Sequence, residues 1–545
     1  MSTQDRVNPF HDGELQAQIR AGVGDVATWA GGFIRDFLPD QHRTFHTSLP
    51  FLVVSGADTS GRTWVTMVDG AEGFVTSPDP QTVTLDTDID ATDPLFQAFQ
   101  TGTDIGVLGI ELASRRRNRF SGRIRAGANG YTIDIYQTFG NCPQYIHERT
   151  WTRAAKNAVV NAQYSDALTN AQIALITASD TMFVGSGHNG RPGAASNGFD
   201  ASHRGGAPGF VHILDGTHLQ IPDYAGNNFF NTIGNLVSNP RIGLMFVDFD
   251  TGGLLHVSGR TTIDWDPKGF HDPDALRVIN VEIDAVLERS GAVGLRWAKQ
   301  DHLARHLKLV RRETESDSIT SFYFEPCDGR PLQTFEAGQH LPIEVQIPKQ
   351  TTPIKRNYSL SGSPKGKRQY RISVKREDKG VVSRFLHDIL RPGNVIKARN
   401  PSGGFVIPCY DCPLVLVSAG VGLTPMISAL HASAQQQDRI VWFVHGARSG
   451  ADHAFRGEVD QLVAGNENLH CRTYYSEPGL DDVLGLDYSG EGRVTAKRLF
   501  ELNAGPAAQY MLCGPAAFLA DICGELEAGG VPADHIHFET FGPTG

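Results

Sequence analysis

The stretch PLVLVSAGVGLTPMISALHAS, residues 413–433, decides the class of the C-terminal part of this chain. Its first half is a continuous apolar run bounded by glycines, as in a buried parallel strand, and its second half has the pattern of the helix that follows. A strand, a glycine-rich turn and a helix, in this order, form the context in which a glycine motif binds a nucleotide. Pro425 stands near where a third glycine would fall, so this is not the Rossmann fingerprint. With the later strand-like runs VWFVHGAR, CRTYYSEP and QYMLCGP, residues 409–545 are predicted to form a parallel-sheet α/β domain.

Residues 305–408 have a different pattern, typical of a small antiparallel β-barrel. Strand-like runs occur at 308–326, 338–347, 356–362, 370–377 and 394–401, and SRFLHDIL reads as one helix. The helix begins just after Gly380, with Ser383 in its first turn. Unpaired N–H groups and the helix dipole make such a start a site for an anionic phosphate or pyrophosphate.

Four short segments follow one another in these two regions: RNYSL at 356–360, SAGVGLTPM at 418–426, LCGP at 512–515 and FETFG at 538–542. In this order they resemble the ferredoxin–NADP reductase superfamily, and most closely the reductase half of flavohaemoglobins. The resemblance covers Leu307 to Gly545. It implies an NAD(P)H-dependent oxidoreductase in which FAD takes the nicotinamide hydride.

The resemblance also implies roles for residues on the flavin side. Arg356 would neutralise the flavin phosphate, Tyr358 would pack on the flavin, and Ser359 would bond near its reactive nitrogen. The remaining FAD-binding candidates would line the flavin edge, hold the pyrophosphate or cover the ring: Ser373, Val374, Lys375, Gly380, Val382, Ser383 and Phe541.

On the nicotinamide side the resemblance assigns the pyrophosphate turn and the strand end of LCGP. The coenzyme-binding candidates are Gly420, Gly422, Thr424, Pro425, Gly514 and Pro515. Cys513 would lie beside the nicotinamide and Glu539 would support the proton and charge balance of the flavin, so Ser359, Cys513 and Glu539 are the catalytic candidates. Arg448 and Arg472 could take a 2′-phosphate, whereas Glu477 would repel one, and the balance leans slightly to NADH.

The N-terminal part reads as strand after strand. Between Phe51 and Ile146 alternation and β-branched residues predict six strands with a helical LFQAFQ after the third. After a helical stretch at 155–180 the same order returns, at a spacing of roughly 120 residues, with a helix at 227–239. Two units are predicted, 1–160 and 161–304.

The second of these units resembles the pyridoxamine 5′-phosphate oxidase-like split barrel, through GFVHILDG, IPDY and GNLVSNPRIGLMF. The resemblance implies a tandem pair of barrels that imitates a dimer and binds FMN between its halves. Oxidases of that family hold the FMN phosphate with Arg and Lys, where this chain has Ala225, Gly226, Asn227 and Asn228. Ser202, His203 and Arg204 form an alternative donor set, since Arg binds phosphate bidentately. A polar hairpin with a solvated Arg is the other interpretation, and Ser202, Arg204 and Asn227 are the FMN-binding candidates.

Composition restricts the partners. A net charge of −11 lacks the basic excess of a nucleic-acid-binding protein, and the run Arg115, Arg116, Arg117 and Arg119 reads as a solvated strand face or a phosphate contact. No leader and no stretch of about 18 apolar residues is seen, so a soluble, cytoplasmic protein without a membrane partner is expected. The seven cysteines are scattered, which argues for reduced thiols and no metal site.

These observations predict a multidomain β and α/β protein: tandem split β-barrels, an antiparallel FAD-binding barrel and a parallel-sheet NAD(P)-binding domain. Neither an iron–sulfur domain nor a globin segment is expected, so electrons would pass from FAD to FMN or a small acceptor at the split barrels, or to a separate protein. The alternative makes the split barrels a non-redox binding module for haem, a deazaflavin or a partner protein. Oxidation of a pyridoxine-type substrate is a third hypothesis, and a homodimer is left open.

Overall fold

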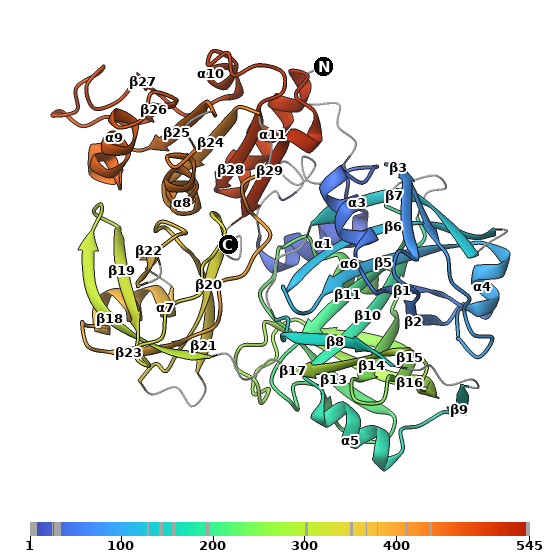
Figure 1. Ribbon diagram of the computed structural model, residues 1–545. Helices are drawn as coiled ribbons and strands as arrows, with labels where there is room; N and C mark the ends of the chain where they lie inside the picture. Colours follow the sequence, from blue (N-terminus) through green and yellow to red (C-terminus); the bar gives the residue numbers. More distant parts are fainter. Residues whose placement is uncertain are drawn as a thin grey trace. The chain divides into compact units, whose positions relative to one another are not determined.

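The computed structural model describes residues 8–23, 26, 34–127, 130–140, 145–154, 160–190, 196–299, 304–348, 353–366, 368–378, 380–408, 412–436 and 439–540. These residues divide into two compact units, an N-terminal unit up to residue 299 and a C-terminal unit from residue 304 (Figure 1). The prediction of a multidomain β and α/β protein is confirmed, while the four segment boundaries stay a prediction.

The first half of the N-terminal unit, called here the first repeat (51–140), is a seven-stranded antiparallel sheet with the strand order β2-β1-β5-β6-β7-β4-β3. Its apolar residues alternate along the strands, so one face of the sheet closes over a buried core. The helix α4 (Phe96–Thr101) leads into β5, and the strands are β1 (Phe51–Ala57), β2 (Thr63–Asp69), β3 (Val75–Asp79), β4 (Thr82–Leu85), β5 (Thr103–Glu111), β6 (Arg116–Gly127) and β7 (Gly130–Gly140).

The second repeat (181–290) has the same strand order, element for element: β11-β10-β14-β15-β16-β13-β12. The helix α6 (Asn231–Ser238) leads into β14 as α4 leads into β5. The strands of this repeat are β10 (Thr181–His188), β11 (Gly198–Gly205), β12 (His212–Ile213), β13 (His218–Asp223), β14 (Arg241–Asp248), β15 (Gly253–Asp264) and β16 (Arg277–Ser290).

A β-bulge is repeated as well. The β6–β7 ladder shifts register between Ser121 and Gly122, and the β15–β16 ladder shifts between Ser258 and Gly259. A Cβ on Gly122 would lie 2.2 Å from a backbone oxygen of the next strand, and one on Gly259 would lie 2.3 Å from such an oxygen, so both bulges require glycine. The two repeats can therefore be aligned residue by residue on the sequence Ser-Gly-Arg that each contains.

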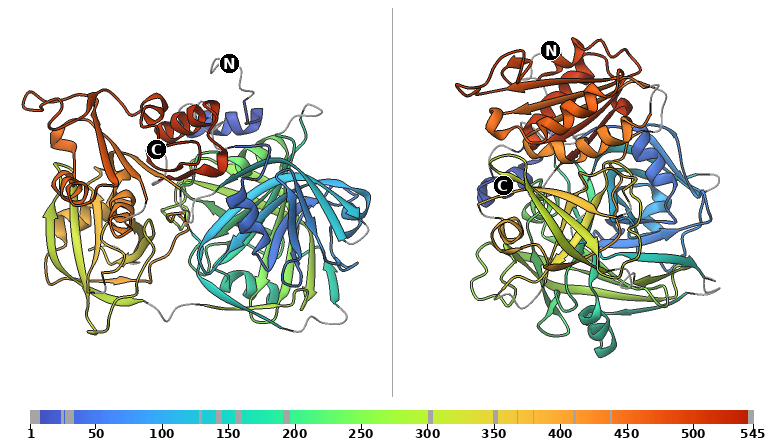
Figure 2. Two further views of the ribbon diagram at one scale, coloured as in Figure 1. Left: turned by 45° about the horizontal axis from the view of Figure 1, so that its top comes forward. Right: turned by 60° about the vertical axis from the view of Figure 1, so that its left-hand side comes forward.

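The repeats pack on each other reciprocally. A Cβ on Gly106 of β5 would meet the backbone of Phe199 on β11 at 2.3 Å, and one on Gly243 of β14 would meet the backbone of Trp64 on β2 at 2.8 Å. In the alignment Gly106 corresponds to Gly243 and β2 to β11. Equivalent patches that contact each other in both directions are the signature of a two-fold interface, here within one chain. Figure 2 shows the two repeats, coloured blue to cyan and green, packed side by side.

Two details of the N-terminal prediction are wrong. The helix expected at 155–180 is confined to α5 (Asn170–Ala178), and Asn161–Ser165 forms the strand β9, which pairs with β16. Residues 155–159 lie outside the described residues. The strands β11 and β16 were not expected: polar residues interrupt β11, whereas β16 was missed although its alternation of apolar and polar residues is typical of a strand. The remaining elements of the unit are α1 (Asp12–Ala21), α3 (Asp40–Thr47), β8 (Arg149–Arg153) and β17 (Leu295–Lys299).

The C-terminal unit begins with the expected antiparallel barrel, a six-stranded sheet with the order β21-β20-β23-β18-β19-β22. The short helix α7 (Val381–Arg384) continues as the π-helical turn η2 (Phe385–Ile389) and covers the core of the barrel. The strands are β18 (Arg305–Thr314), β19 (Ile319–Pro326), β20 (His340–Val345), β21 (Ile354–Ser359), β22 (Tyr370–Lys375) and β23 (Val395–Ala398).

A parallel α/β sheet follows, with the order β27-β26-β25-β24-β28-β29. The helices α8 (Leu423–Ser433) and α9 (Arg456–Ala464) contact each other, as do α10 (Ala496–Phe500) and α11 (Ala516–Ala528), and the sheet lies between the two pairs (Figure 1). The strands are β24 (Leu414–Ala419), β25 (Val441–Ala447), β26 (Leu469–Tyr475), β27 (Gly490–Glu491), β28 (Gln509–Gly514) and β29 (Ile536–Thr540). The short helical turns η3 (Gly420–Gly422), η4 (Gly450–Asp452) and η5 (Ala533–His535) complete this domain.

Candidate functional site

The glycine turn lies where the sequence predicted, between the buried strand β24 and helix α8. Gly420 has a φ of 54°, in the left-handed region that favours glycine. A Cβ on Gly422 would lie 2.1 Å from the carbonyl oxygen of Cys513, so this turn packs directly against the end of β28. Thr424 and Pro425 stand in the first turn of α8, where the missing N–H of proline costs no helical hydrogen bond. The turn therefore offers a cradle of backbone groups at the carboxyl edge of the sheet.

Four polar side chains lie in register across this sheet at the level of the turn. Ser418 on β24 pairs with His445 on β25 and with Cys513 on β28, and Cys513 pairs with Glu539 on β29. Burial lowers the pKa of His445 to about 3, and its Nδ1 lies 2.9 Å from the Oγ of Ser418. Burial, and then the charge of Glu539, hold the pKa of the Cys513 thiol well above its usual value. Desolvation raises the pKa of Glu539 to about 8, and its Oε2 has no hydrogen-bond partner among the described residues.

At neutral pH this row is therefore uncharged: a neutral imidazole, a thiol and a protonated carboxyl group. The thiol of Cys513 is not a nucleophile under these conditions, since the thiolate is the reactive form. Gly514 ends β28, and Pro515 is the N-cap residue of α11. A Cβ on Gly514 would come within 2.8 Å of the ring of Phe518, so glycine is needed where the strand meets the helix. The candidates of the coenzyme side thus share one edge of one sheet.

On the barrel, the candidate flavin residues lie along β21. Arg356 is exposed, and its guanidinium donates a hydrogen bond to the backbone oxygen of Lys355. Tyr358 is half-buried, and desolvation raises its pKa to about 12, so it stays a neutral phenol. Ser359 is 6% exposed, and within the described part of the chain its hydroxyl has no hydrogen-bond partner. A buried hydroxyl without a partner is costly in a protein, which fits a ligand that supplies the missing bond.

The three candidates on β22 offer less side-chain chemistry to a ligand. The hydroxyl of Ser373 lies 2.7 Å from that of Ser321 and 2.6 Å from that of Ser361. The side chain of Val374 belongs to the barrel core. The ammonium group of Lys375 pairs with Glu377 at 2.9 Å. Backbone groups of this strand, rather than these side chains, are what a flavin could use.

The predicted pyrophosphate cradle is the start of α7. Gly380 is its N-cap residue, Val382 is buried in the core, and the hydroxyl of Ser383 donates to the carbonyl oxygen of Gly380 at 3.0 Å. The helix begins after Gly380, as expected, but it has four residues before the π-helical turn. Phe541 lies outside the described residues.

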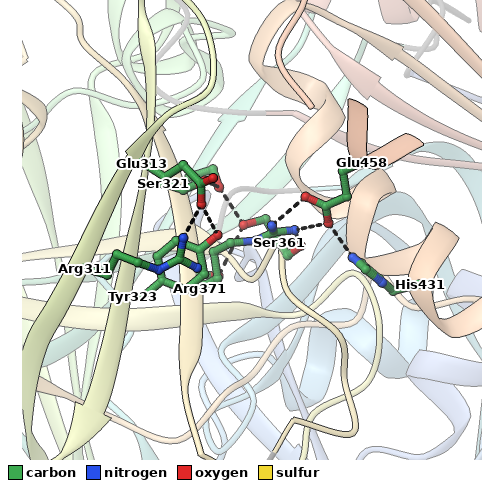
Figure 3. Close-up of polar contacts among 9 residues, drawn as sticks. Arg311, Glu313, Ser321, Tyr323, Ser361, Arg371, His431 and Glu458 are labelled. Atoms are coloured by element: carbon green, nitrogen blue, oxygen red, sulfur yellow. Dashed lines mark hydrogen bonds and ion pairs between the residues drawn. The ribbon is translucent and has the colours of Figure 1, made fainter. Parts of the chain in front are cut away.

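An ion pair missed by the sequence analysis joins the barrel to the α/β domain. Arg371 of β22 donates from both terminal nitrogens to Glu458 of α9, at 2.7 Å each (Figure 3). Glu458 also lies 2.5 Å from the Nε2 of His431 on α8, and Arg371 donates to the backbone oxygen of Ser361. Burial alone would raise the pKa of Glu458, but the bonds from His431 and Arg371 lower it to about 2. No local pattern marks this pair, because its members are far apart in the sequence.

In the N-terminal unit, one cavity of about 100 Å³ brings together Ser202, Arg204 and Asn227. Arg117 and Arg119 of β6 line it from the first repeat, so the cavity is built by both repeats. Arg277 of β16 lines it as well and was not predicted, because its strand was not recognised. Arg204 lies on strand β11, which pairs antiparallel with β10, and its side chain is 24% exposed and pairs with Asp223 at 2.8 Å, so both interpretations of this segment stay open.

More guanidinium groups than carboxylates line the cavity. Four arginines line it against one carboxylate, Asp223, which also pairs with Arg277 at 2.8 Å. Helix α6 starts at the cavity, and its N-cap residue, Phe230, offers no side-chain hydrogen bond to the first turn. The Oγ of Thr232 in that turn lies 3.2 Å from the Oγ of Ser202. Guanidinium groups, hydroxyls and a helix start are the donors that anionic groups bind.

His203 lies between Ser202 and Arg204 on β11 and also lines the cavity. An Nη1 of Arg117 lies 3.3 Å from the Nδ1 of His203, and since arginine only donates, Nδ1 accepts and Nε2 carries the proton. That Nε2 is buried and has no hydrogen-bond partner. Burial, and then the charge of Arg117, keep the pKa of His203 well below its usual value, so the ring is neutral. This N–H is buried next to the ring of Phe183, so His203 lines the cavity but is not assigned as a donor to its ligand.

The described part of the chain shows neither a metal-binding cluster nor a helix that could span a membrane. Among the described residues, no group of three or more His, Cys, Asp and Glu side chains is placed to hold a metal ion. Within the same residues, no helix combines the length and apolar character needed to cross a bilayer.

Comparison with known proteins identifies the C-terminal unit. Residues 306–407 match the oxidoreductase FAD-binding domain, and residues 416–524 match the oxidoreductase NAD-binding domain. The flavohemoprotein of Rhizobium meliloti is 42% identical over 245 residues, and that of Bacillus subtilis is 41% identical over 237 residues. These matches cover 44% and 43% of this chain, and 60% and 58% of the relatives, so the chain spans less than two thirds of their length.

Among solved structures, the flavohem-like FAD/NAD-binding domain of nitric oxide dioxygenase from Vibrio cholerae is 34% identical. It is covered completely by 44% of this chain, with a TM-score of 0.41. The predicted resemblance to a flavohaemoglobin reductase half is confirmed for these residues. The C-terminal unit is therefore a reductase module made of an oxidoreductase FAD-binding domain followed by an oxidoreductase NAD-binding domain.

Proposed function

We propose that this protein is an NAD(P)H-dependent FAD oxidoreductase that passes electrons to FMN, or to a similar small phosphate-bearing acceptor, in the N-terminal unit. FAD, when bound, supplies the chemistry, since it takes a hydride and gives electrons up singly or in pairs. The observation that supports the acceptor is the cavity of the N-terminal unit, where four arginines face one carboxylate. Such an excess of guanidinium groups favours a phosphate.

We further propose that the N-terminal unit is a tandem pair of split barrels of the pyridoxamine 5′-phosphate oxidase type. The identical strand order of the two repeats and their reciprocal packing at Gly106 and Gly243 support this. The cavity lies at the junction of the two repeats, as a cofactor site between two barrels would.

The residues of the reductase module have distinct tasks in this proposal. The hydroxyl of Ser359 would bond the flavin, and the exposed Arg356 would reach its phosphate. The protonated carboxyl group of Glu539 would hold a proton close to the reacting rings, because its pKa lies near 8. The turn at Gly422 would let the coenzyme pyrophosphate approach the backbone closely.

A count of the extracted cofactors tests the acceptor. FAD and FMN near one each per chain are expected, while FAD alone would refute a flavin acceptor and favour a non-redox module that binds haem, a deazaflavin or a protein. An Arg204→Ala variant should lose FMN and retain FAD, because Arg277 still pairs with Asp223 and preserves the fold. Loss of one charge-assisted hydrogen bond corresponds to about 10- to 100-fold weaker binding. Arg260→Ala is the matched control, since this arginine is exposed on β15 outside the cavity.

Anaerobic mixing with NADH tests the electron entry. The flavin absorption band should bleach, and Arg356→Ala should lower the FAD content or slow the bleaching. Lys397→Ala serves as its control, because Lys397 is an exposed cation on the same barrel that pairs with Glu344. A variant at Arg356 that keeps full FAD and full bleaching would contradict the assignment.

A further inference from the structure

The alignment of the two repeats defines a second position equivalent to the arginine-lined cavity. Arg119 of β6 and His256 of β15 each lie three residues before the bulge glycine of their strand, so they correspond to each other in the alignment. Ser202 of β11 corresponds to Thr66 of β2 in the same way, since each pairs with the equivalent valine of the neighbouring strand. The cavity uses a hydroxyl of one repeat and a basic side chain of the other, and a two-fold arrangement repeats that combination at Thr66 and His256.

The second position is filled by the chain itself. The hydroxyl of Thr66 donates to the carboxylate of Asp93 at 2.5 Å, and Arg289 of β16 donates to the same carboxylate oxygen at 2.7 Å. Asp93 precedes α4 and accepts the N–H of Leu95 at 3.0 Å, so it stands at the helix start that corresponds to the start of α6. All of these groups are buried, with Asp93 6% and Arg289 3% exposed.

The two equivalent positions are built from the same kinds of groups. Each has a hydroxyl on the second strand of a repeat, the start of the following helix and basic side chains from the other repeat. The position at Ser202 has a cavity, whereas the position at Thr66 is occupied by the carboxylate of Asp93. His256 stands where Arg119 stands in the other repeat, but burial lowers its pKa to about 4 and its Nδ1 donates to the backbone oxygen of Val65 at 2.7 Å, so Arg289 is the charged basic group at this position.

We propose that the N-terminal unit has one open anion site, and that Asp93 occupies the second, equivalent site as a built-in anion that neutralises Arg289. This inference rests on the proposed function for the open site, whose ligand is a phosphate-bearing molecule. It implies one such ligand for each chain, where two equivalent sites would hold two.

The first experiment is the cofactor count after incubation with excess FMN. One FMN for each FAD supports the inference, and two would overturn it. The absence of FMN would instead refute the proposed acceptor, and the second experiment then decides the inference alone.

The second experiment replaces the built-in anion by a free one. Asp93→Ala should lower the thermal midpoint, because Arg289 loses its buried partner at 2.7 Å and keeps only the partly exposed Asp90 at 3.7 Å, and formate should restore it. A rise of about 2–4 °C is expected for each tenfold increase in formate above its Kd. The double variant D93A/R289M has no buried charge to neutralise, so its midpoint should not respond to formate beyond the response of the unchanged protein.

An Asp93→Ala midpoint that depends on formate no more than that of the unchanged protein would overturn the inference. If Asp93→Ala does not fold, Asp93→Ser is used for the same titration, because the serine hydroxyl can still accept the N–H of Leu95 at the helix start and leaves room for formate. Formate binding at the open cavity affects all variants alike and cancels in the comparison.

Discussion

The ion pair between Arg371 and Glu458 should stabilise the reductase module and fix the orientation of its two domains. Glu458→Gln keeps the shape of the side chain and removes its charge. Arg371 is 9% exposed and would lose its bidentate partner (Figure 3). It would retain its bond to the backbone oxygen of Ser361 and its contact with the ring of Phe455 at 5.0 Å. Breaking one side of a buried pair costs about 3–5 kcal/mol, and the remaining contacts place this case near 3 kcal/mol.

The pKa of Glu458 gives a second route to the same magnitude. A fall from 4.5 to about 2 corresponds to about 3 kcal/mol of extra stability for the charged form. Because the pKa is lower in the folded state, this contribution is present above pH 4.5 and is lost as the pH falls toward 2. The Gln variant should lack this part of the acid dependence.

Two assays check the prediction. Urea unfolding, followed by the fluorescence of released FAD, should show a loss of about 3 kcal/mol in Glu458→Gln. Stopped-flow reduction by saturating NADH should be slowed by roughly 10- to 100-fold, since a displacement near 1 Å between reacting groups has such an effect. Asp460→Asn on the same helix is the matched control, because its pair with Arg456 is exposed and its loss should cost under about 1 kcal/mol.

A Glu458→Gln protein within about 0.5 kcal/mol of the parent, with the same acid dependence, would refute this reasoning. The double variant R371M/E458L separates the two roles of the pair. Apolar replacement should recover much of the stability, while the slow reduction should persist if the pair sets the domain orientation.

Three further changes have defined outcomes. Glu14→Gln should remove a pH dependence of stability, because burial, and then Asp200, raise the pKa of Glu14 from 4.5 to about 8. The free energy of unfolding of the parent should fall by about 1.4 kcal/mol per pH unit between these values, and that of the variant should not. Thermal midpoints from about pH 5 to 8 check this difference. Gly422→Ala forces a Cβ against the end of β28, so it should cost about 1–3 kcal/mol of stability and raise the KM for NADH. Gly457→Ala, in open space on α9, is the control and should cost no stability. Equal KM values for the two variants would contradict the proposal that the turn at Gly422 binds the coenzyme. Ser359→Ala should leave the stability of the FAD-free protein unchanged, because the hydroxyl has no protein partner, and slow flavin reduction by roughly tenfold; an unchanged rate in stopped flow would remove Ser359 from the site.

Much of the reductase module could be predicted because its signals are local. The run from Pro413 to Ser433 contains a strand, a turn and a helix that are contiguous in the sequence, and the structure has all three. Helix α7 likewise begins after Gly380, as expected. Such signals depend on neighbours along the chain, and long-range packing only confirms them.

The N-terminal unit was predicted less completely for the opposite reason. Strand β11 is interrupted by polar residues and so lacks the pattern that marked the other strands, whereas β16 was missed although its apolar and polar residues alternate. Arg119 and Arg277 lie far apart in the sequence and meet only through the register of the sheets. A search for the repeated Ser-Gly-Arg segment could have aligned the repeats, but not shown which equivalent site is open.

The sequence by itself therefore determined the chemistry of electron entry, because strand, turn and helix motifs are contiguous and their function depends on local backbone geometry. Only the tertiary structure decided where charge accumulates and where it is cancelled. Arg204 faces a cavity and Arg289 faces Asp93 because sheet register and the reciprocal packing of the repeats, not the chain order, choose the neighbours of a buried charge.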